Sequence, residues 1–183
     1  MTNSVLAPDR PLPEGMRDLL FADARALRDM NERLRQTLST WGYEDLILPT
    51  FEYADTLSTG IGAAVDSRLY RFLDRQGRTL ALRPDLTIPT ARVAGSRVYD
   101  QPMPLRIANA GSVFRYEPSG AGWQHEVEQA GAELIGVSGA HADAEIIALA
   151  AEALRSAGIP EFRLMVGHAG FMGSLLNDRR LPS

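Results

Sequence analysis

LRIANAGSVFRY, residues 105–116, and QHEVEQAGAELI, residues 124–135, are the two stretches that decide the fold. Both have the apolar and β-branched content, and the alternation of side chains, that are typical of strands. The link between them, Glu117 to Gly122, contains one Pro, one Ser and two Gly, which is the composition of a surface loop. A short loop joins antiparallel neighbours, so the central region predicts an antiparallel sheet and an α+β domain.

Two long helices are predicted on either side of this region. Leu19 to Trp41 repeats apolar residues at three- and four-residue steps, and Gly42 then suits a left-handed helix end. The expected buried stripe is Leu20, Ala24, Leu27, Met30, Leu34, Leu38 and Trp41. Ala142 to Ala157 shows the same periodicity and ends before Gly158 and Pro160. Its expected buried stripe is Ile146, Leu149, Ala150, Ala153 and Leu154.

Shorter elements follow from turn residues. Residues 69–74 and 78–83 predict a β-hairpin with Gly77 in the turn, and Asp85 or Thr87 caps a helix that runs to about Ala94. We also expect strands at 43–48, ended by Pro49, and at 162–166, and a short helix at 170–177. We expect residues 1–12 to form an extended lead-in and residues 13–183 to form one domain.

The composition excludes several kinds of chemistry. The 183 residues contain no Cys, so disulfides, thiolate metal sites and a Cys nucleophile are excluded. All 19 basic residues are Arg, which excludes a Lys Schiff base and the Lys of a P-loop. The net charge of −4 gives no general attraction to nucleic acid, and no apolar run is long enough for a membrane span. We therefore expect a cytoplasmic protein.

The sequence contains only weak signals for a bound cofactor. Gly60 to Val65 (GIGAAV) is a near miss to a dinucleotide fingerprint, but it lacks the third Gly and a preceding strand, so a surface loop is the better interpretation. The three His residues are too far apart for a two-ligand helical metal motif. No cofactor and no metal are expected.

One face of the second central strand carries a candidate binding site. Strand periodicity puts Gln129, Gly131 and Glu133 on the same face, with His125 at its start. An amide, a carboxylate and bare backbone between them could hold a small polar ligand. A solvent-facing polar strand explains the pattern about as well, but Gly131 has little reason to weaken such a strand. Arg115 could bind an anion on the same side, although an ordinary exposed Arg is the stronger interpretation of that residue alone.

These segments resemble the histidyl-tRNA synthetase family. The similar motifs are Arg83-Pro-Asp-Leu-Thr87 with residues 72–82 before it, Val113-Phe-Arg-Tyr-Glu117, and Gln129-Ala-Gly-Ala-Glu-Leu-Ile-Gly136. Residues 12–20, the long helix and residues 42–52 resemble the family's opening and its first class II motif. The resemblance covers about residues 11–176. It implies a class II aminoacyl-tRNA synthetase-like antiparallel β-sheet flanked by helices, shortened because the third class II motif and an anticodon-binding domain are missing.

Two branches of this family fit. One is a true synthetase, of which this chain would be a catalytic fragment. The other is the non-catalytic paralogue that regulates ATP phosphoribosyltransferase in L-histidine biosynthesis, and three features favour it. Asp85 stands where synthetases usually carry Glu, Trp123 to His125 stand where they carry Arg for ATP and tRNA, and residues 142–150 resemble the regulatory branch. A bare scaffold without ligand binding is a third possibility.

The resemblance also implies a site and partners. L-Histidine would lie among Asp85, Thr87, Arg115, Gln129 and Glu133, with Asp85 toward the α-ammonium and Arg115 toward a carboxylate or phosphate. The chain would have no catalytic residue of its own and would activate a short-form catalytic subunit of ATP phosphoribosyltransferase. We expect a homodimer within a hetero-oligomer, and no tRNA partner.

Overall fold

A long antiparallel pair of strands forms the centre of the molecule. The computed structural model describes residues 12–116, 124–168 and 170. β5 (Leu105–Phe114) and β6 (Glu126–Ile135) pair antiparallel along their full length, with Asn109 opposite Gly131. This confirms the predicted strands and the α+β class, while the predicted loop 117–122 and most of the helix 170–177 lie outside the described residues.

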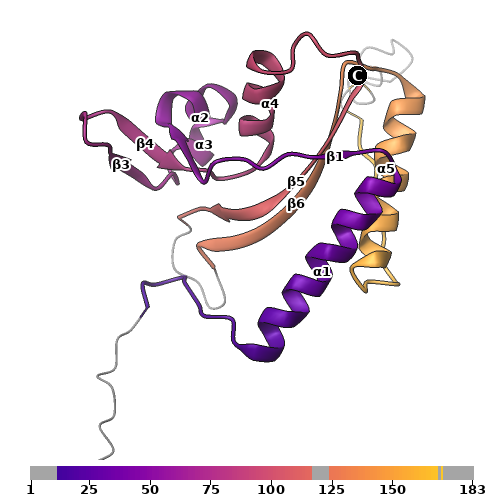
Figure 1. The fold of residues 1–183 in the computed structure, drawn as a ribbon, viewed down its shortest axis with the longest axis horizontal. Coiled ribbons are helices and arrows are strands. Elements are labelled where there is room, and N and C mark those ends of the chain that lie inside the picture. The colour runs from indigo at the N-terminus through magenta and orange to yellow at the C-terminus, as the bar shows by residue number, and fades with distance from the viewer. Residues whose placement is uncertain (1–11, 117–123, 169, 171–183) are drawn as a thin grey trace, which may run out of the picture.

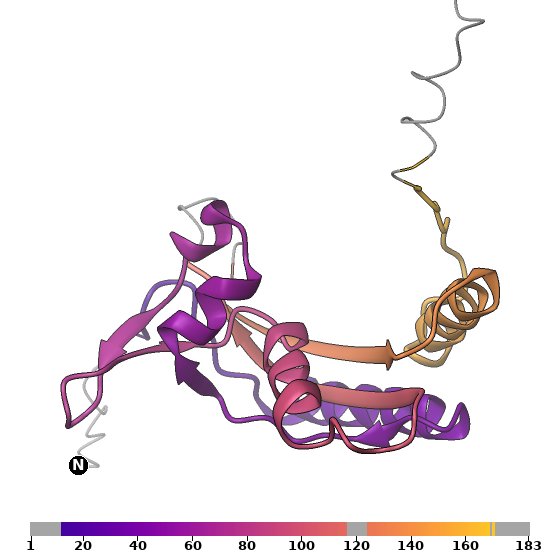
Figure 2. The same cartoon turned by 90° about the horizontal axis from the view of Figure 1, so that it is seen from above.

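The two faces of this sheet are covered by different helices. Even-numbered side chains of β5 face α1 (Phe21–Thr40) and α5 (Ala140–Ser156), because Ala108 packs with Leu38 and Leu149. Odd-numbered side chains face α4 (Thr87–Ser96), because Val113 packs with Leu86. Figures 1 and 2 show α1 and α5 lying together on one side of β5 and β6, with α4 on the other. Period-two alternation thus gives each strand two separate packing surfaces.

The long helices follow their predicted stripes with two exceptions. α1 buries Leu38 fully, and its other predicted stripe positions within the helix are half-buried. Leu20 is 59% exposed because it precedes the helix, so its assignment to the stripe was wrong. Gly42 ends the helix region with a φ of 81°, as expected. In α5 Leu149 is buried, but Ala150 is exposed and does not belong to the stripe.

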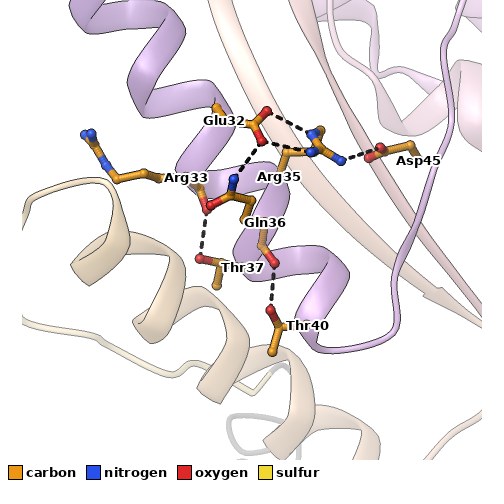
Figure 3. A network of polar contacts seen from close by, with 7 residues as sticks. All are labelled: Glu32, Arg33, Arg35, Gln36, Thr37, Thr40 and Asp45. Atoms are coloured by element: carbon orange, nitrogen blue, oxygen red, sulfur yellow. Dashed lines mark hydrogen bonds and ion pairs between the residues drawn. The ribbon is translucent and has the colours of Figure 1, made fainter.

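The polar side of α1 carries a local network of charges. Figure 3 shows Glu32 accepting hydrogen bonds from both Arg35 and Gln36, each within one turn of the helix. Arg35 also donates to Asp45 at 3.3 Å, which connects the helix to the strand that follows it. These groups are exposed, so the network orients side chains more than it stabilises the fold.

A second, smaller sheet has the order β2-β4-β3 (Phe51–Tyr53, Thr79–Leu82, Arg71–Leu73). β3 and β4 form the predicted hairpin, and Gly77 has the φ of 78° that its turn requires. α2 (Ala54–Gly60) packs on it, with Leu57 fully buried against Ala81, and α3 (Ala63–Asp66) lies next to α2. Gly60 ends α2 and residues 63–65 belong to α3, so the predicted loop is confined to residues 61 and 62.

Two predicted strands differ from the structure. Between residues 43 and 48 only β1 (Glu44–Asp45) forms, and it runs parallel to β5, which makes the main sheet mixed. The Leu46 N–H still donates to Ala108 O at 2.7 Å, and beyond it Leu48 packs with Leu86 and Val113. The segment 162–166 is extended but pairs with no strand among the described residues, and Met165 is 86% exposed.

None of the helices in the described part of the chain combines the length and the apolar composition needed to cross a bilayer.

Candidate functional site

The segment that begins α4 is anchored by a buried guanidinium. Arg83 is 6% exposed and donates from Nε to Ser112 O at 2.8 Å and from Nη1 to Leu48 O at 2.8 Å. Nη1 also lies 3.2 Å from Pro49 O. Burial lowers the pKa of Arg83. By satisfying these carbonyls Arg83 holds the chain at the start of α4 against the end of β5.

Asp85 and Thr87 lie together at the N-terminus of α4. The Asp85 carboxylate accepts a hydrogen bond from the backbone N–H of Ile88 at 3.1 Å, so it satisfies one of the free donors of the first turn. Thr87 is the first helical residue and is exposed. Of the two predicted caps, the acceptor is therefore Asp85. One carboxylate oxygen is committed to the helix, and the group is held in a defined orientation.

α4 is joined to the sheet by a buried hydrogen bond. Asn109 Nδ2 donates to Thr90 Oγ1 at 2.8 Å, and both residues are buried. Because Asn109 is paired with Gly131 across the sheet, this bond places α4 over the Gly131 side of β6. We did not single out Asn109 from the sequence, although a polar residue at an inward position of an apolar strand was a readable signal.

A cavity of about 510 Å³ lies between α4 and β6. Thr87, Thr90 and Glu133 supply its polar groups. The remaining wall is mostly apolar and consists of Ala91, Ala94, Gly95, Tyr99, Met103 and Ile135. An apolar cavity with a few convergent polar groups is the ordinary form of a small-molecule site. The structure thus brings two of the predicted residues, Thr87 and Glu133, into one cavity.

The other predicted residues lie around this cavity. Asp85 lies two residues before Thr87, and Arg115 Nε donates to Pro84 O at 2.7 Å, which holds Arg115 beside the same segment. Gln129 is on the same sheet face as Glu133, opposite Gly111, and on the far side of Gly131. Gln129 is not among the residues that line the cavity.

His125 is buried directly before the start of β6. It is 5% exposed, and its Nδ1 lies 2.6 Å from the hydroxyl of Tyr70. Its backbone N–H donates to Gly15 O at 2.9 Å, and its ring packs near that of Tyr116. His125 therefore joins the N-terminal segment to the hairpin region. His125 lies directly before β6, as expected, and its side chain belongs to an aromatic cluster with Tyr70 and Tyr116.

Acidic and His side chains do not gather into a metal site anywhere in residues 12–116, 124–168 or 170. The polar groups that line the cavity include the Glu133 carboxylate and the hydroxyls of Thr87 and Thr90, which suit hydrogen bonds to a small organic cation.

The mixed sheet, the helix that follows Arg83-Pro84-Asp85 and the cavity between them define a class II synthetase-like core. The Histidyl-tRNA synthetase family model matches residues 15–183, and the chain belongs to this family.

Named relatives and solved structures agree with this assignment. The "ATP phosphoribosyltransferase regulatory subunit" of Moorella thermoacetica is 46% identical over 93% of this chain and 44% of that protein. A crystal structure described as an ATP phosphoribosyltransferase regulatory subunit/histidyl-tRNA synthetase from Bacillus halodurans C has a TM-score of 0.82 and 40% identity. The alignment covers 91% of this chain and 43% of the chain in that structure.

A more distant similarity is to apo histidyl-tRNA synthetase of S. aureus, with a TM-score of 0.69 and 25% identity. That alignment covers 81% of this chain and 35% of the synthetase. The chain thus spans less than half the length of the relatives it matches.

Proposed function

We propose that this chain carries the class II core of a non-catalytic regulatory subunit of ATP phosphoribosyltransferase. The observation that carries the proposal is the level of identity, 46% and 43%, to proteins that bear that name in Moorella thermoacetica and Symbiobacterium thermophilum. Its place is then the cytoplasm, and its partner is a short-form catalytic subunit. The homodimer within a larger hetero-oligomer is part of the same proposal.

The second part of the proposal is that L-histidine is the ligand of the cavity. Glu133 and Thr87 line it, and the apolar wall between α4 and β6 accommodates the carbon skeleton of an amino acid. Asp85 lies two residues from Thr87 and carries a further carboxylate for the ammonium group. Arg115 would face the ligand's carboxylate, and Gln129 would contact it from the neighbouring position on the sheet.

A regulatory rather than catalytic role is supported by the charges near the site. Adenylation builds negative charge on ATP phosphates, and fixed cations are needed to stabilise it. The family resemblance implies that synthetases carry such cations where this chain has Trp123, Gln124 and His125, and His125 is buried with its Nδ1 2.6 Å from the Tyr70 hydroxyl. Histidine would then act by binding one state of the complex more tightly than the other.

Calorimetric titration with L-histidine tests the ligand. We expect saturable heat from the chain alone or with the catalytic subunit present. A flat titration in both samples would remove the histidine site from the proposal.

A pull-down with a short-form catalytic subunit, followed by its phosphoribosyltransferase assay, tests the partner. The proposal predicts co-purification and a rise in the partner's activity that added histidine reduces. Asp85→Ala and Glu133→Ala should abolish the histidine response. If both variants respond to histidine like the wild type, the chain is a scaffold without the proposed site.

Pyrophosphate exchange with ATP and histidine separates this proposal from the alternative, a catalytic fragment of a synthetase. The likeness to the S. aureus enzyme is the reason to make this test. We expect no exchange above background, whereas robust exchange would establish the synthetase alternative.

A further inference from the structure

His125 connects three parts of the chain that are far apart in the sequence. Its backbone N–H donates to Gly15 O in the N-terminal segment, and its carbonyl oxygen accepts from the backbone N–H of Arg115, directly after β5, each at 2.9 Å. Its ring Nδ1 lies 2.6 Å from the hydroxyl of Tyr70, which directly precedes β3. The backbone of Arg115 is therefore bonded to a residue that is itself tied to the hairpin and to the N-terminal segment.

The imidazole of His125 is tightly enclosed. It is 5% exposed, and the ring centroids of Tyr70 and Tyr116 lie 6.0 and 5.3 Å from its own. Gly15 lies directly against the imidazole, because a Cβ added there would overlap the ring. The φ of 73° at Gly15 is also one that favours glycine. In such close packing the imidazole cannot shift without moving its neighbours.

The side chain of Arg115 is oriented from a second direction. Its Nε donates to Pro84 O at 2.7 Å, and the backbone N–H of Phe114 donates to Arg83 O at 2.9 Å. The place of the terminal guanidinium nitrogens depends on these bonds and on the backbone position that the His125 carbonyl helps to fix. A group held in its binding orientation loses less freedom when a ligand arrives, so its support contributes to affinity.

We infer that Tyr70 is a positioning residue of the proposed site: through its hydrogen bond with His125 it holds the Arg115 guanidinium where it receives the carboxylate of the bound ligand. Tyr70 is not among the residues that line the cavity between α4 and β6, so its effect passes through His125 and the backbone of Arg115. This inference rests on the proposed histidine site and assigns what orients its anion-binding group.

Titration with L-histidine and with histidinol, which lacks the carboxylate, tests the inference. Each variant is titrated in the sample, with or without the catalytic subunit, in which the wild type binds histidine. Tyr70→Phe keeps the ring and removes only the hydroxyl. It should weaken histidine binding about 3- to 10-fold, the effect of one hydrogen bond, and leave histidinol binding unchanged. In the Arg115→Ala background the same change should have no further effect, because the group that Tyr70 positions is gone.

Tyr53→Phe is the matched control, because Tyr53 lies on β2 and is 44% exposed. It should bind both ligands like the wild type. Thermal unfolding checks that each variant folds. If Tyr70→Phe does not fold, Gly15→Ala replaces it, since the added methyl group displaces the same imidazole and should cause the same selective loss of histidine binding.

Three results overturn the inference while leaving the histidine site in place. They are wild-type histidine binding by Tyr70→Phe, an equal loss of both ligands, and an undiminished effect of Tyr70→Phe in the Arg115→Ala background. Absence of histidine binding by the wild type overturns the site itself, and the role of Tyr70 with it.

Discussion

Arg115 Nε donates a 2.7 Å hydrogen bond to the carbonyl oxygen of Pro84, so the end of β5 is held against the segment that begins α4. This bond occupies one nitrogen of the guanidinium and leaves its terminal nitrogens for a ligand. It also positions the cation beside Asp85, the residue proposed to bind the opposite charge. The pair would suit the two charged ends of an amino acid.

We predict that Arg115→Ala weakens L-histidine binding by about tenfold or more, because one charge-assisted hydrogen bond is lost. Histidinol, which lacks the carboxylate, should bind equally to the variant and the wild type. Both are measured by calorimetric titration, with Arg25→Ala on the exposed side of α1 as the control. A parallel loss of histidinol binding would contradict a contact with the carboxylate.

Glu133→Gln should reduce histidine binding by about 10- to 100-fold, since it removes the charge from the cavity while keeping the side-chain shape. Glu126→Gln provides the control, because Glu126 is exposed on the same strand and its side chain belongs to the other face. The two affinities are compared at one pH and one salt concentration. Similar values for both variants would show that the carboxylate of Glu133 does not contact the ligand.

Low pH should remove the stabilisation of the fold by the ion pair between Arg106 on β5 and Glu145 on α5. The hydrogen bonds from Arg106, 2.8 Å each, are the main cause that lowers the pKa of Glu145. A lowered pKa means that the stabilisation is complete above the unfolded value of about 4.3 and is lost as the pH falls through the folded value. At pH 7 we expect Glu145→Gln to have a lower melting temperature than the wild type.

The same variant tests the sign of the linkage. The difference in melting temperature between Glu145→Gln and the wild type should shrink as the pH falls below the unfolded value of about 4.3. There the unfolded chain binds a proton that the folded, Arg106-paired carboxylate still resists, and the difference is lost once the folded group is protonated too. Glu152→Gln on the same helix is a useful comparison, since Glu152 accepts a hydrogen bond from the neutral indole N–H of Trp41, which a glutamine can also accept. A gap that stays constant from pH 7 to pH 3 would contradict the prediction.

At high pH, ionisation of Tyr43 should lower the stability of the fold. Burial raises the pKa of Tyr43 to about 12, and the hydrogen bond from its hydroxyl to Glu145 at 3.0 Å adds to the shift. A raised pKa means that the stabilisation is complete below the unfolded value of about 10 and is lost as the pH rises toward 12. Tyr43→Phe cannot ionise, so its stability should fall less than that of the wild type between pH 10 and pH 12. Denaturant unfolding at both pH values measures this, and equal losses would refute it.

Leu57→Ala should lower the free energy of unfolding by about 2–5 kcal/mol, because it leaves a cavity at a fully buried position beneath the smaller sheet. Leu73→Ala makes the same chemical change at a side chain that is 68% exposed, and it should stay within about 0.5 kcal/mol of the wild type. Urea denaturation of the three proteins gives the comparison. If Leu73→Ala costs as much as Leu57→Ala, the exposed side of the hairpin is covered in solution.

Much of the secondary structure could be predicted because it depends on local pattern. Alternation defined β5 and β6, three- and four-residue steps defined α1 and α5, and Gly77 marked its turn, since each signal reflects the geometry of a few neighbouring residues. The same alternation placed Gln129, Gly131 and Glu133 on one face, which the register of the strands confirms. The binding roles of these residues stay predictions.

Contacts between distant segments could not be predicted in this way. The parallel pairing of β1, the unpaired segment 162–166 and the burial of His125 against Tyr70 each depend on which segment lies next to another. Strand propensity does not specify which segment a strand pairs with. A donor forms its hydrogen bond only after folding has brought an acceptor next to it.

The sequence by itself determined the alternating faces, the helical stripes, the absence of Cys and Lys chemistry and the resemblance to class II synthetases. Only the tertiary structure decided that Thr87 and Glu133 share a cavity and that Asn109 donates a hydrogen bond to Thr90. The physical reason is that periodicity fixes the direction of a side chain relative to its own backbone. Its partners are fixed only when α4 packs over the sheet and the Thr90 hydroxyl orients the Asn109 amide.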